Sequence, residues 1–330
     1  MLFRLADPDA RYAAVRLSSD LPPQEFDRDN GEWRLELREP AVERLEYQLE
    51  VVHDDGGTER LLDPDNPHRA PGAFGEKSVL LAPGYAPPDW LEEPQVEGQV
   101  ISITTPRRGL AVDVDLWSPA DADPREPLPL LVAHDGPEYD RLADLTRFAA
   151  AKIHADELPR HRIALLAPGK RDEWYSASPR YTRALTHQVL PALARHAPTH
   201  GPPAAMGASL GALALLFAER RHPGTFGGLF LQSGSFFMPR HDAHESRFPR
   251  YRRVVRVVRE LTRDAGRPVP ATLTCGIAEE NLANNRLMAR TLAAQGFDVE
   301  LHEVPDLHNF TGWRDALHPH LTRLLARVWT

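Results

Sequence analysis

Cysteine is almost absent from this chain of 330 residues, which contains only Cys275. A single cysteine cannot form an intramolecular disulfide, a cysteine zinc site or a Cys-x-x-Cys redox motif. Because Cys275 lies inside an apolar strand pattern, we expect no thiol chemistry from it.

Positive charge is also in short supply. The chain has 39 Lys and Arg against 47 Asp and Glu, a formal net charge of −8, and the two signs are interspersed along the sequence. This pattern lacks the one-sided basic field on which nonspecific nucleic-acid binding depends. We therefore expect no nucleic-acid partner.

Long apolar segments are missing as well. No stretch reaches the roughly 20 apolar residues of a membrane helix, and the N-terminal MLFRLADPDARY has no continuous apolar segment of signal-peptide length. We therefore expect no membrane partner and interpret the protein as cytoplasmic.

What the sequence does contain is two patterns in succession. Residues 1–80 alternate short strand-like runs such as EWRLELR and RLEYQLEVV with turn signals such as DRDNG and HDDGG, which is typical of a small all-β sandwich. A proline-rich stretch, including PGYAPPDWLEEP, follows and would interrupt any regular element. We place a domain boundary near residue 95, so that the sandwich and its linker occupy 1–95.

Residues 96–330 alternate strand and helix patterns. VISITT and AVDVDLWSP predict antiparallel strands, LPLLVAHDG and RIALLAPG predict buried parallel strands, and helical patterns such as LGALALLFAERRH separate the later strands. This alternation predicts βαβ units and a mostly parallel sheet with helices on both faces. The predicted fold class is α/β, preceded by a small all-β domain.

The motif Gly-Ala-Ser-Leu-Gly at 207–211 lies between a predicted strand and a predicted helix. In this context G-x-S-x-G forms a nucleophile elbow, a tight turn that projects the serine hydroxyl above the sheet at a helix N-terminus. The alternative is a Gly/Ser turn whose serine only caps the helix, which accounts for most chance matches. The strand-turn-helix setting favours Ser209 as a nucleophile.

A nucleophilic serine needs a general base and a carboxylate that orients this base. His308, in PDLHNFTGW after the last predicted strand, is predicted to be the base, and the alternative is a solvated loop histidine. Two glutamates follow the preceding strand in GIAEEN. We predict Glu279 as the acid and Glu280 as the fallback, the alternative for both being a helix-capping role.

The other histidines of this region favour no metal site. His302 lies within a strand pattern, and the spacing of His318 and His320 puts them on different faces of a terminal helix. We predict neither a metal site nor a cofactor.

The tetrahedral intermediate of ester hydrolysis needs backbone N–H donors. We expect one from Leu210, directly after the nucleophile, and a second from the HDGPE turn at 134–138. Pro137 has no N–H to donate, so the second donor is predicted to be Gly136 or Glu138.

The chain contains, in this order, the HDG turn, KRDEWYSASPRYTRAL, MGASLGALALLFAERRHPGTFGGLFLQSGSF, GIAEEN and HNFTGWR. In order and spacing these segments resemble the enterochelin esterase-like branch of the putative esterase family. EWRLELREP, LEYQLEV and LLDPDNP resemble the immunoglobulin-like domain that precedes the hydrolase in that branch. The resemblance covers nearly the whole chain. It implies an α/β-hydrolase whose better-known relatives hydrolyse the trilactone of catecholate siderophores, so that iron is released in the cytoplasm.

The resemblance also implies roles for individual residues. It makes Ser209 the nucleophile, His308 the base and Glu279 the acid of a G-x-x-E loop. Arg171 matches the arginine of the family's R-x-x-E-[LY] segment, whereas Glu173 falls one residue short of that segment's acidic position.

The histidine segment departs from the family pattern. The family's Gly-Gly-His-Asp reads Asp-Leu-His-Asn at 306–309, although Trp313 and Arg314 match its distal Trp-Arg. The loss of two glycines changes the backbone conformations open to the loop, and Asn309 replaces a carboxylate next to the histidine.

A ferric catecholate is a polyanion, so a siderophore esterase should carry arginines and aromatics around its mouth. Arg171, Trp174 and Tyr175 follow a predicted parallel strand and should therefore lie at the sheet edge where α/β enzymes bind ligands. We predict these three as substrate-binding residues. His134 and Asp135 of the HDG turn either contact substrate or hold the loop by hydrogen bonds.

A second cationic segment, RFPRYRRVVRVVRELTR, stands where α/β-hydrolases insert lid elements. Arg252, Arg256, Arg259 and Arg263 recur in it at helical spacing. We interpret these arginines as a solvated helix face, with the intervening valines turned toward the core.

Three functions compete at this stage. The leading hypothesis is a serine carboxylesterase with an acyl-enzyme intermediate, acting on a small-molecule ester such as a ferric siderophore. A second is a hydrolase of acylated sugars or feruloyl esters that uses the sandwich as a carbohydrate module. Trp33 and Trp90, if exposed, would favour it, but we expect one of them in the sandwich core and the other in the linker. A third is a binding protein whose altered loop has inactivated His308. The sequence leaves open whether the chain forms a homo-oligomer.

Overall fold

The computed structural model describes residues 1–105 and 110–329. The chain divides into two compact units. The first comprises Met1–Ala86 and two short later segments, Gly276–Glu279 and Pro305–Gly312, and the second holds Pro87–Cys275, Glu280–Val304 and Trp313–Thr330. The predicted domain boundary near residue 95 refers to parts of the chain that fold independently, and it stays a prediction.

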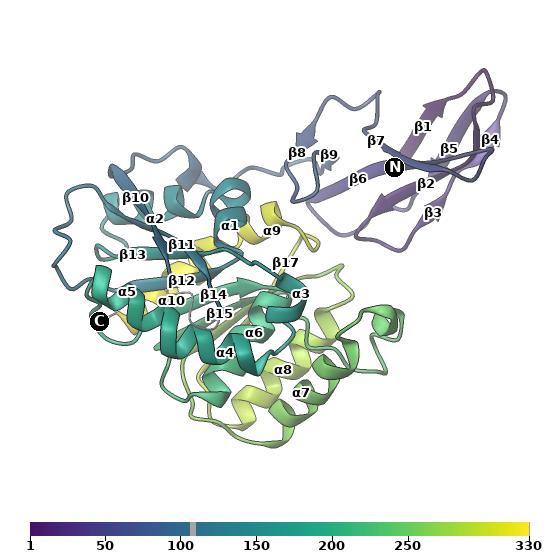
Figure 1. Ribbon diagram of the computed structural model, residues 1–330. Helices are drawn as coiled ribbons and strands as arrows, with labels where there is room; N and C mark the ends of the chain where they lie inside the picture. Colours follow the sequence, from purple (N-terminus) through teal and green to yellow (C-terminus); the bar gives the residue numbers. More distant parts are fainter. Residues whose placement is uncertain (106–109, 330) are drawn as a thin grey trace. The chain divides into compact units, whose positions relative to one another are not determined.

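The first unit has the all-β architecture that the sequence predicted (Figure 1). One antiparallel sheet has the strand order β1-β5-β4, and a larger one has the order β3-β2-β6-β9-β8, with β7 paired to β6. The strands are β1 (Leu2–Ala6), β2 (Tyr12–Ser19), β3 (Gln24–Glu25), β4 (Asp27–Asp29), β5 (Glu32–Glu36), β6 (Arg44–His53), β7 (Thr58–Leu61), β8 (Arg69–Ala70) and β9 (Lys77–Leu81).

The core of this unit follows from alternation along its strands. Phe3 and Leu5 of β1 are buried between exposed neighbours, and they pair in register with Leu35 and Trp33 of β5. Because side chains alternate between the two faces of a strand, these apolar residues share one face. Their core cluster also contains residues of β2 and β6, so it includes side chains from both sheets, and Leu307 belongs to it as well.

The second unit is built on an eight-stranded mixed sheet with the order β10-β11-β13-β12-β14-β15-β16-β17. The pairs β10–β11 and β11–β13 are antiparallel, and the pairs from β13 through β16 are parallel. The predicted fold class, an α/β-hydrolase preceded by a β domain, is therefore confirmed. The strands are β10 (Gly98–Thr104), β11 (Asp113–Pro119), β12 (Leu130–His134), β13 (Arg162–Leu166), β14 (Ala204–Ala208), β15 (Gly228–Gln232), β16 (Ala271–Gly276) and β17 (Val299–Val304).

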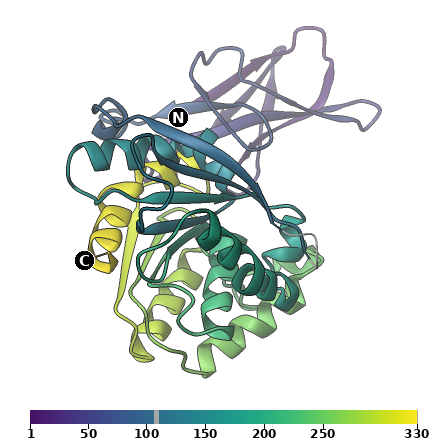
Figure 2. The ribbon, with the colours of Figure 1, turned by 60° about the vertical axis from the view of Figure 1, so that its left-hand side comes forward.

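Helices lie on both faces of this sheet (Figures 1 and 2). The α-helices are α1 (Gly136–Ala143), α2 (Leu145–His154), α3 (Arg171–Trp174), α4 (Pro179–Ala184), α5 (Leu190–His196), α6 (Leu210–Arg221), α7 (Tyr251–Arg263), α8 (Leu282–Ala294), α9 (Phe310–Asp315) and α10 (Thr322–Val328). Four short helical turns join them: η1 (Asp89–Leu91), η2 (Leu185–Val189), η3 (His244–Arg247) and η4 (Leu317–Leu321). Within the described ranges, no helix has both the length and the apolar character needed to cross a bilayer.

Candidate active site

Ser209 occupies a strained turn between β14 and α6. Its backbone has φ 56° and ψ −122°, and its side chain makes no capping hydrogen bond to the helix, so the capping alternative does not hold. The flanking glycine explains how the turn closes. A Cβ added to Gly207 would lie 3.0 Å from the backbone carbon of Gly211 and 3.2 Å from the Cβ of His134. The turn therefore has the local geometry of a nucleophile elbow.

The hydroxyl of Ser209 has a neighbour that the sequence analysis missed. Ser209 Oγ lies 3.0 Å from Ser235 Oγ, and the Ser235 N–H donates to the Ser209 carbonyl at 3.1 Å. Ser235 is buried and follows β15, the parallel neighbour of β14. Its place after the end of a neighbouring parallel strand was the signal that could have identified it.

Both backbone segments predicted to bind an oxyanion begin helices. Leu210 starts α6, and Gly136 starts α1 with Pro137 in its first turn. First-turn N–H groups have no partner inside a helix, and proline costs no hydrogen bond at that position. Gly136 cannot be replaced without strain, because an added Cβ would lie 2.3 Å from the Cα of Leu165. Gly136 and Glu138 thus remain the predicted second donors.

His134 joins the HDG turn to the elbow. Its ring is fully buried, with Nδ1–H donating to the Gly211 carbonyl at 3.1 Å and Nε2 accepting from the Tyr181 hydroxyl at 2.9 Å. Burial lowers the pKa of His134 to about 3, which keeps the imidazole neutral and matches this pattern of one donor and one acceptor. The ring also stacks on Tyr175, with centroids 4.4 Å apart.

Asp135 and Arg171 hold the same turn by a bidentate ion pair. Asp135 is buried in the left-handed conformation, with φ 50°. Arg171 donates from Nε and Nη2 to its two carboxylate oxygens at 2.8 and 2.9 Å. Tyr175, predicted to bind substrate, has no exposed surface in this structure and stacks against His134 in the support of this turn. Its contact with substrate stays a prediction. Trp174 keeps part of its surface exposed.

The predicted base and acid contact each other directly within the first unit. His308 Nδ1–H donates to Glu279 Oε2 at 2.7 Å, and the other carboxylate oxygen of Glu279 accepts the Gly276 N–H at 2.7 Å. The Glu279 side chain is 1% exposed, whereas that of His308 is 29% exposed. Because Nδ1 carries the proton shared with Glu279, Nε2 is the nitrogen left to accept a proton.

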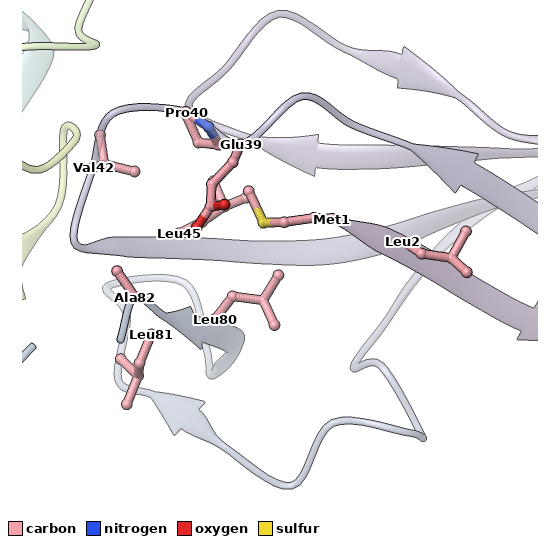
Figure 3. A pocket seen from close by; sticks show the side chains of 9 residues that line it. All are labelled: Met1, Leu2, Glu39, Pro40, Val42, Leu45, Leu80, Leu81 and Ala82. Carbon is pink, nitrogen blue, oxygen red and sulfur yellow. The ribbon is translucent and has the colours of Figure 1, made fainter. Parts of the chain in front are cut away.

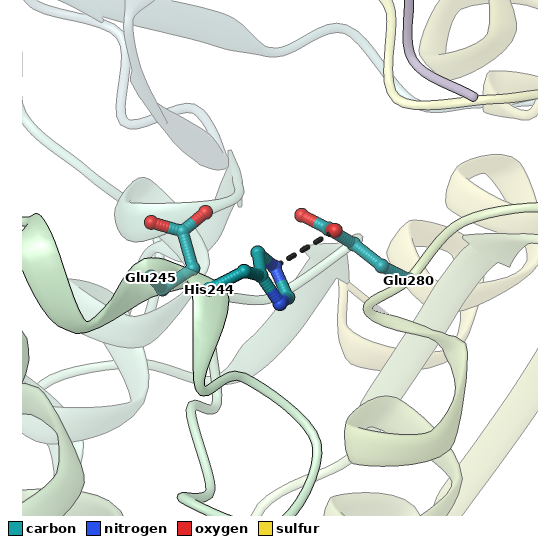
Figure 4. A group of neighbouring side chains, drawn as sticks. All are labelled: His244, Glu245 and Glu280. Atoms are coloured by element: carbon teal, nitrogen blue, oxygen red, sulfur yellow. Dashed lines mark ion pairs between the residues drawn. The ribbon is translucent and has the colours of Figure 1, made fainter. Parts of the chain in front are cut away.

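Glu280, the fallback acid, has a different partner. Its carboxylate lies 2.8 Å from His244 Nε2, and both side chains are about half exposed (Figure 4). With Glu245 they form a group whose potential ligand atoms lie within 4.8 Å of one another. Exposed acidic groups of this kind are common without an ion, so the cluster does not establish a metal site.

The two residues that replace the family's glycines are anchors of the His308 loop. Neither Asp306 nor Leu307 is among the described non-glycine residues with positive φ, so the loop does not need glycine here. Leu307 is 1% exposed in the β core. Asp306 is buried and accepts the Leu307 N–H at 2.7 Å and the Asn309 Nδ2–H at 2.9 Å, and burial raises the pKa of Asp306 to about 6.

The arginine-rich segment forms α7. Its four stripe arginines are exposed and its valines are buried, as a solvated helix face requires. A fifth arginine, outside the stripe, has a specific role. Arg253 donates from Nη1 to the Glu173 carboxylate at 2.8 Å and from Nε to the Ser176 carbonyl at 2.7 Å. This contact ties α7 to the segment that carries Arg171.

Neither tryptophan considered for carbohydrate binding is exposed. Trp33 is 6% exposed and donates to Asp7 in the β core, and Trp90 is 1% exposed against Phe148. Figure 3 shows a cavity of about 250 Å³ in the first unit. It is lined by Met1, Leu2, Glu39, Pro40, Val42, Leu45, Leu80, Leu81 and Ala82. These residues include no nucleophile or imidazole, so they offer no acyl-transfer chemistry.

Comparison with known proteins agrees with this fold. A model of the putative esterase family matches residues 108–324, and a search of curated proteins finds no match. The chain is similar to the ferric enterobactin esterase from Salmonella typhimurium, with a TM-score of 0.77 and 20% identity over 99% of this chain and 93% of that one. It is also similar to the enterobactin esterase from Shigella flexneri solved with enterobactin, with a TM-score of 0.73 and 20% identity over 99% and 92%.

A third similar structure matches a smaller share of this chain. A ferulic acid esterase aligns with a TM-score of 0.60 and 15% identity, and the alignment covers 71% of this chain and 100% of that one. Identities this low show a shared fold. The enterobactin esterases share it over nearly the whole chain, and the ferulic acid esterase shares it over less.

Proposed function

Because the chain belongs to the putative esterase family, we propose that it is a serine carboxylesterase in which Ser209, His308 and Glu279 form the catalytic triad. The observation that carries this assignment is the 2.7 Å hydrogen bond between His308 Nδ1 and the buried Glu279 carboxylate. A carboxylate on Nδ1 fixes the tautomer in which Nε2 is a base.

The positions of the three residues along the chain support the same triad. Ser209 directly follows β14, and the acid and the base follow β16 and β17 by a few residues. β14 and β16 run parallel through β15, so they end at the same edge of the sheet. The order Ser, acid, His is that of α/β-hydrolases.

The proposed reaction has two steps. His308 Nε2 takes the hydroxyl proton as Ser209 Oγ attacks the ester carbonyl, and it returns this proton to the leaving alcohol, which yields an acyl-enzyme. A water, deprotonated by the same nitrogen, then attacks the acyl-enzyme. As the bond to Ser209 Oγ breaks, Nε2 returns the proton to Oγ, and the acid is released with the enzyme regenerated. The oxyanion of both tetrahedral intermediates accepts the N–H of Leu210 and one N–H from the start of α1, at Gly136 or Glu138.

For the substrate we propose a catecholate siderophore ester, iron-bound or iron-free. Support comes from the similarity to enterobactin esterases, which extends over the β unit as well as the hydrolase. A feruloyl or sugar ester is the second candidate, favoured by the similarity to a ferulic acid esterase. The burial of Trp33 and Trp90 removes the aromatic surface on which a carbohydrate-module version of that candidate depended.

The test compares variants on a panel of esters: p-nitrophenyl butyrate, methyl ferulate, and trilactone catecholate siderophores with and without iron. Ser209→Ala and His308→Ala should each lower kcat on the order of 10⁴-fold or more. The adjacent glutamates give a matched pair. Glu279→Gln should lower kcat by about 10²- to 10⁴-fold, whereas Glu280→Gln should leave it unchanged.

The outcomes separate mechanism from substrate. Cleavage of the trilactone that requires Ser209 supports both proposals, and cleavage of p-nitrophenyl butyrate or ferulate alone supports the triad but rejects the siderophore. Equal losses in Glu279→Gln and Glu280→Gln would reject Glu279 as the acid. Failure of a fluorophosphonate probe to label Ser209 would favour the binding-protein alternative.

A further inference from the structure

The segment that carries His308 belongs to the β unit. Pro305–Gly312 and Gly276–Glu279 group with Met1–Ala86. Leu307, directly before His308, is buried in the core cluster of the β strands. The Pro305 carbonyl accepts the Glu43 N–H at 2.7 Å. The proposed base and acid are thus attached to strands that lie more than two hundred residues earlier in the sequence.

A buried charged network makes the attachment specific. Arg44 and Glu46 lie two apart on β6 and therefore project from the same face, with side chains 4% and 2% exposed. Arg44 Nη2 donates to Glu46 Oε1 at 3.0 Å. Arg44 Nη1 lies 3.5 Å from Asp306 Oδ2 and 3.5 Å from Asn309 Oδ1.

The two loop residues that Arg44 reaches stand on either side of His308. Asp306 Oδ1 accepts from the Leu307 N–H and from Asn309 Nδ2. Asn309 Oδ1 accepts the Gly312 N–H at 2.7 Å. The side chains of Asp306 and Asn309 therefore close the loop on the two sides of His308. Both side chains also lie next to the Arg44 guanidinium.

Stability alone is a poor explanation for this arrangement. Burying an arginine with two carboxylates costs desolvation free energy, and an apolar replacement of similar volume is often equally stable. A planar guanidinium with several fixed donors is, however, well suited to hold separate acceptors in one geometry.

We propose that Arg44 is a positioning residue for the base: it fixes the loop on both sides of His308, so that Nδ1 stays on Glu279 and Nε2 is held in place for proton transfer. This inference rests on the proposed function. It makes the β unit part of the catalytic machinery, in place of a detachable binding module. The exchange of the family's two glycines for Asp306 and Leu307 supplies the anchors.

The decisive variant removes the charged pair together. Arg44→Met/Glu46→Gln keeps the net charge of the buried site and the intraloop hydrogen bonds of Asp306. The variant is assayed as the whole chain with p-nitrophenyl butyrate, and kcat is expressed per active site titrated with a fluorophosphonate. This kcat should fall on the order of 10²-fold, as for a small misplacement of a catalytic group. KM should change by less than about threefold, because ground-state binding is not altered.

Two further variants complete the series. Arg44→Lys keeps the charge but has a single ammonium, which cannot bridge Glu46 and the loop equally well, and kcat should fall about tenfold. Arg34→Met is the matched control, since Arg34 forms exposed ion pairs on β5 of the same unit, and its kcat should equal that of the wild type. Urea unfolding of each variant at the assay temperature shows whether all of them are folded there.

An Arg44→Met/Glu46→Gln protein that is folded and has wild-type kcat would overturn the role of Arg44. If that variant does not fold, Arg44→Lys decides in the same way, and an unchanged kcat there overturns the proposal. Ser209→Ala and His308→Ala are measured alongside. Full activity of Ser209→Ala and His308→Ala would overturn the proposed function and, with it, the role of Arg44. If only these two variants lose activity and the Arg44 variants keep it, only the role of Arg44 is overturned.

Discussion

Around Ser209 the support is mostly backbone. The turn is set by a strained φ of 56°, by the close approach at Gly207, where an added Cβ would lie 3.0 Å from the backbone carbon of Gly211, and by main-chain hydrogen bonds to Gln232 and Ser235. Around His308 the support is mostly side chain: Glu279, Asp306, Asn309 and, from β6, Arg44. We therefore expect substitutions in the two halves of the proposed site to act through different causes, backbone strain around Ser209 and lost side-chain contacts around His308.

This difference also explains what the sequence could predict. The elbow is a local pattern in which glycines, serine and the strand-helix transition lie within a few residues, so the strained turn at Ser209 and the α/β fold could be predicted from the sequence. The contact of Glu279, and not Glu280, with His308 is visible only in the structure, because adjacent side chains point in different directions. The contact of Arg44 with Asn309 joins residues 265 positions apart, and no local pattern contains it.

The roles predicted for the residues near the HDG turn show the same limit. Tyr175 and His134 have the residue types expected at a binding site, but polar aromatics are equally suited to a buried network. Only the structure shows that His134 bonds Gly211 and Tyr181, with Tyr175 stacked beneath it. Residue type predicted that these side chains matter, and their burial shows that they hold the HDG turn.

The largest change in stability is expected from a single methyl group added to Gly136, where the surrounding atoms are backbone. Gly136→Ala would place Cβ 2.3 Å from the Cα of Leu165, and strand backbone cannot move aside as a side chain can. We expect a loss of at least about 4 kcal/mol in the free energy of unfolding, or no soluble folded protein. Urea unfolding measures this.

Gly211→Ala is the matched control. Its nearest atom is the Cβ of His134 at 3.3 Å, and alanine favours a helix more than glycine does, so the change in stability should stay within about 1 kcal/mol. Equal losses in the two variants would show that the backbone of β13 is not the constraint.

The part of the proposed site around His308, which is held by side chains, should lose stability and activity when a cavity is made beside it. Leu307→Ala removes a residue that is 1% exposed in the β core, and we expect it to cost about 3 kcal/mol. Measured where the variant is still folded, kcat should also fall, because Leu307 adjoins His308. Leu2→Ala is the control, since Leu2 is 48% exposed in the same unit. A Leu307→Ala protein that is destabilised but has full kcat would separate packing from positioning.

The pH dependence of stability should single out His134. Its pKa is lowered from 6.5 to about 3, so the folded state favours the neutral imidazole. The stability that this contributes is present above pH 6.5 and is lost as the pH falls toward 3. Between pH 7.5 and pH 5 the wild type should lose about 2 kcal/mol from this residue.

His134→Asn should be less stable than the wild type at pH 7.5 but should lose less on acidification, as measured by urea unfolding at several pH values. His200→Asn, at an exposed histidine of the same unit, should keep the wild-type slope. If His134→Asn also keeps that slope, the buried imidazole does not titrate as its burial requires.

The smallest effect should come from Ser235, although its hydroxyl lies only 3.0 Å from that of Ser209. Ser235→Ala keeps the main-chain hydrogen bond that fixes the elbow and removes one hydroxyl contact, worth about 1 kcal/mol. We therefore expect kcat and the rate of fluorophosphonate labelling to change by less than about fivefold. A loss as large as that expected for Arg44→Met/Glu46→Gln would mean that the nucleophile, like the base, depends on side-chain support, and the contrast between the two halves would disappear.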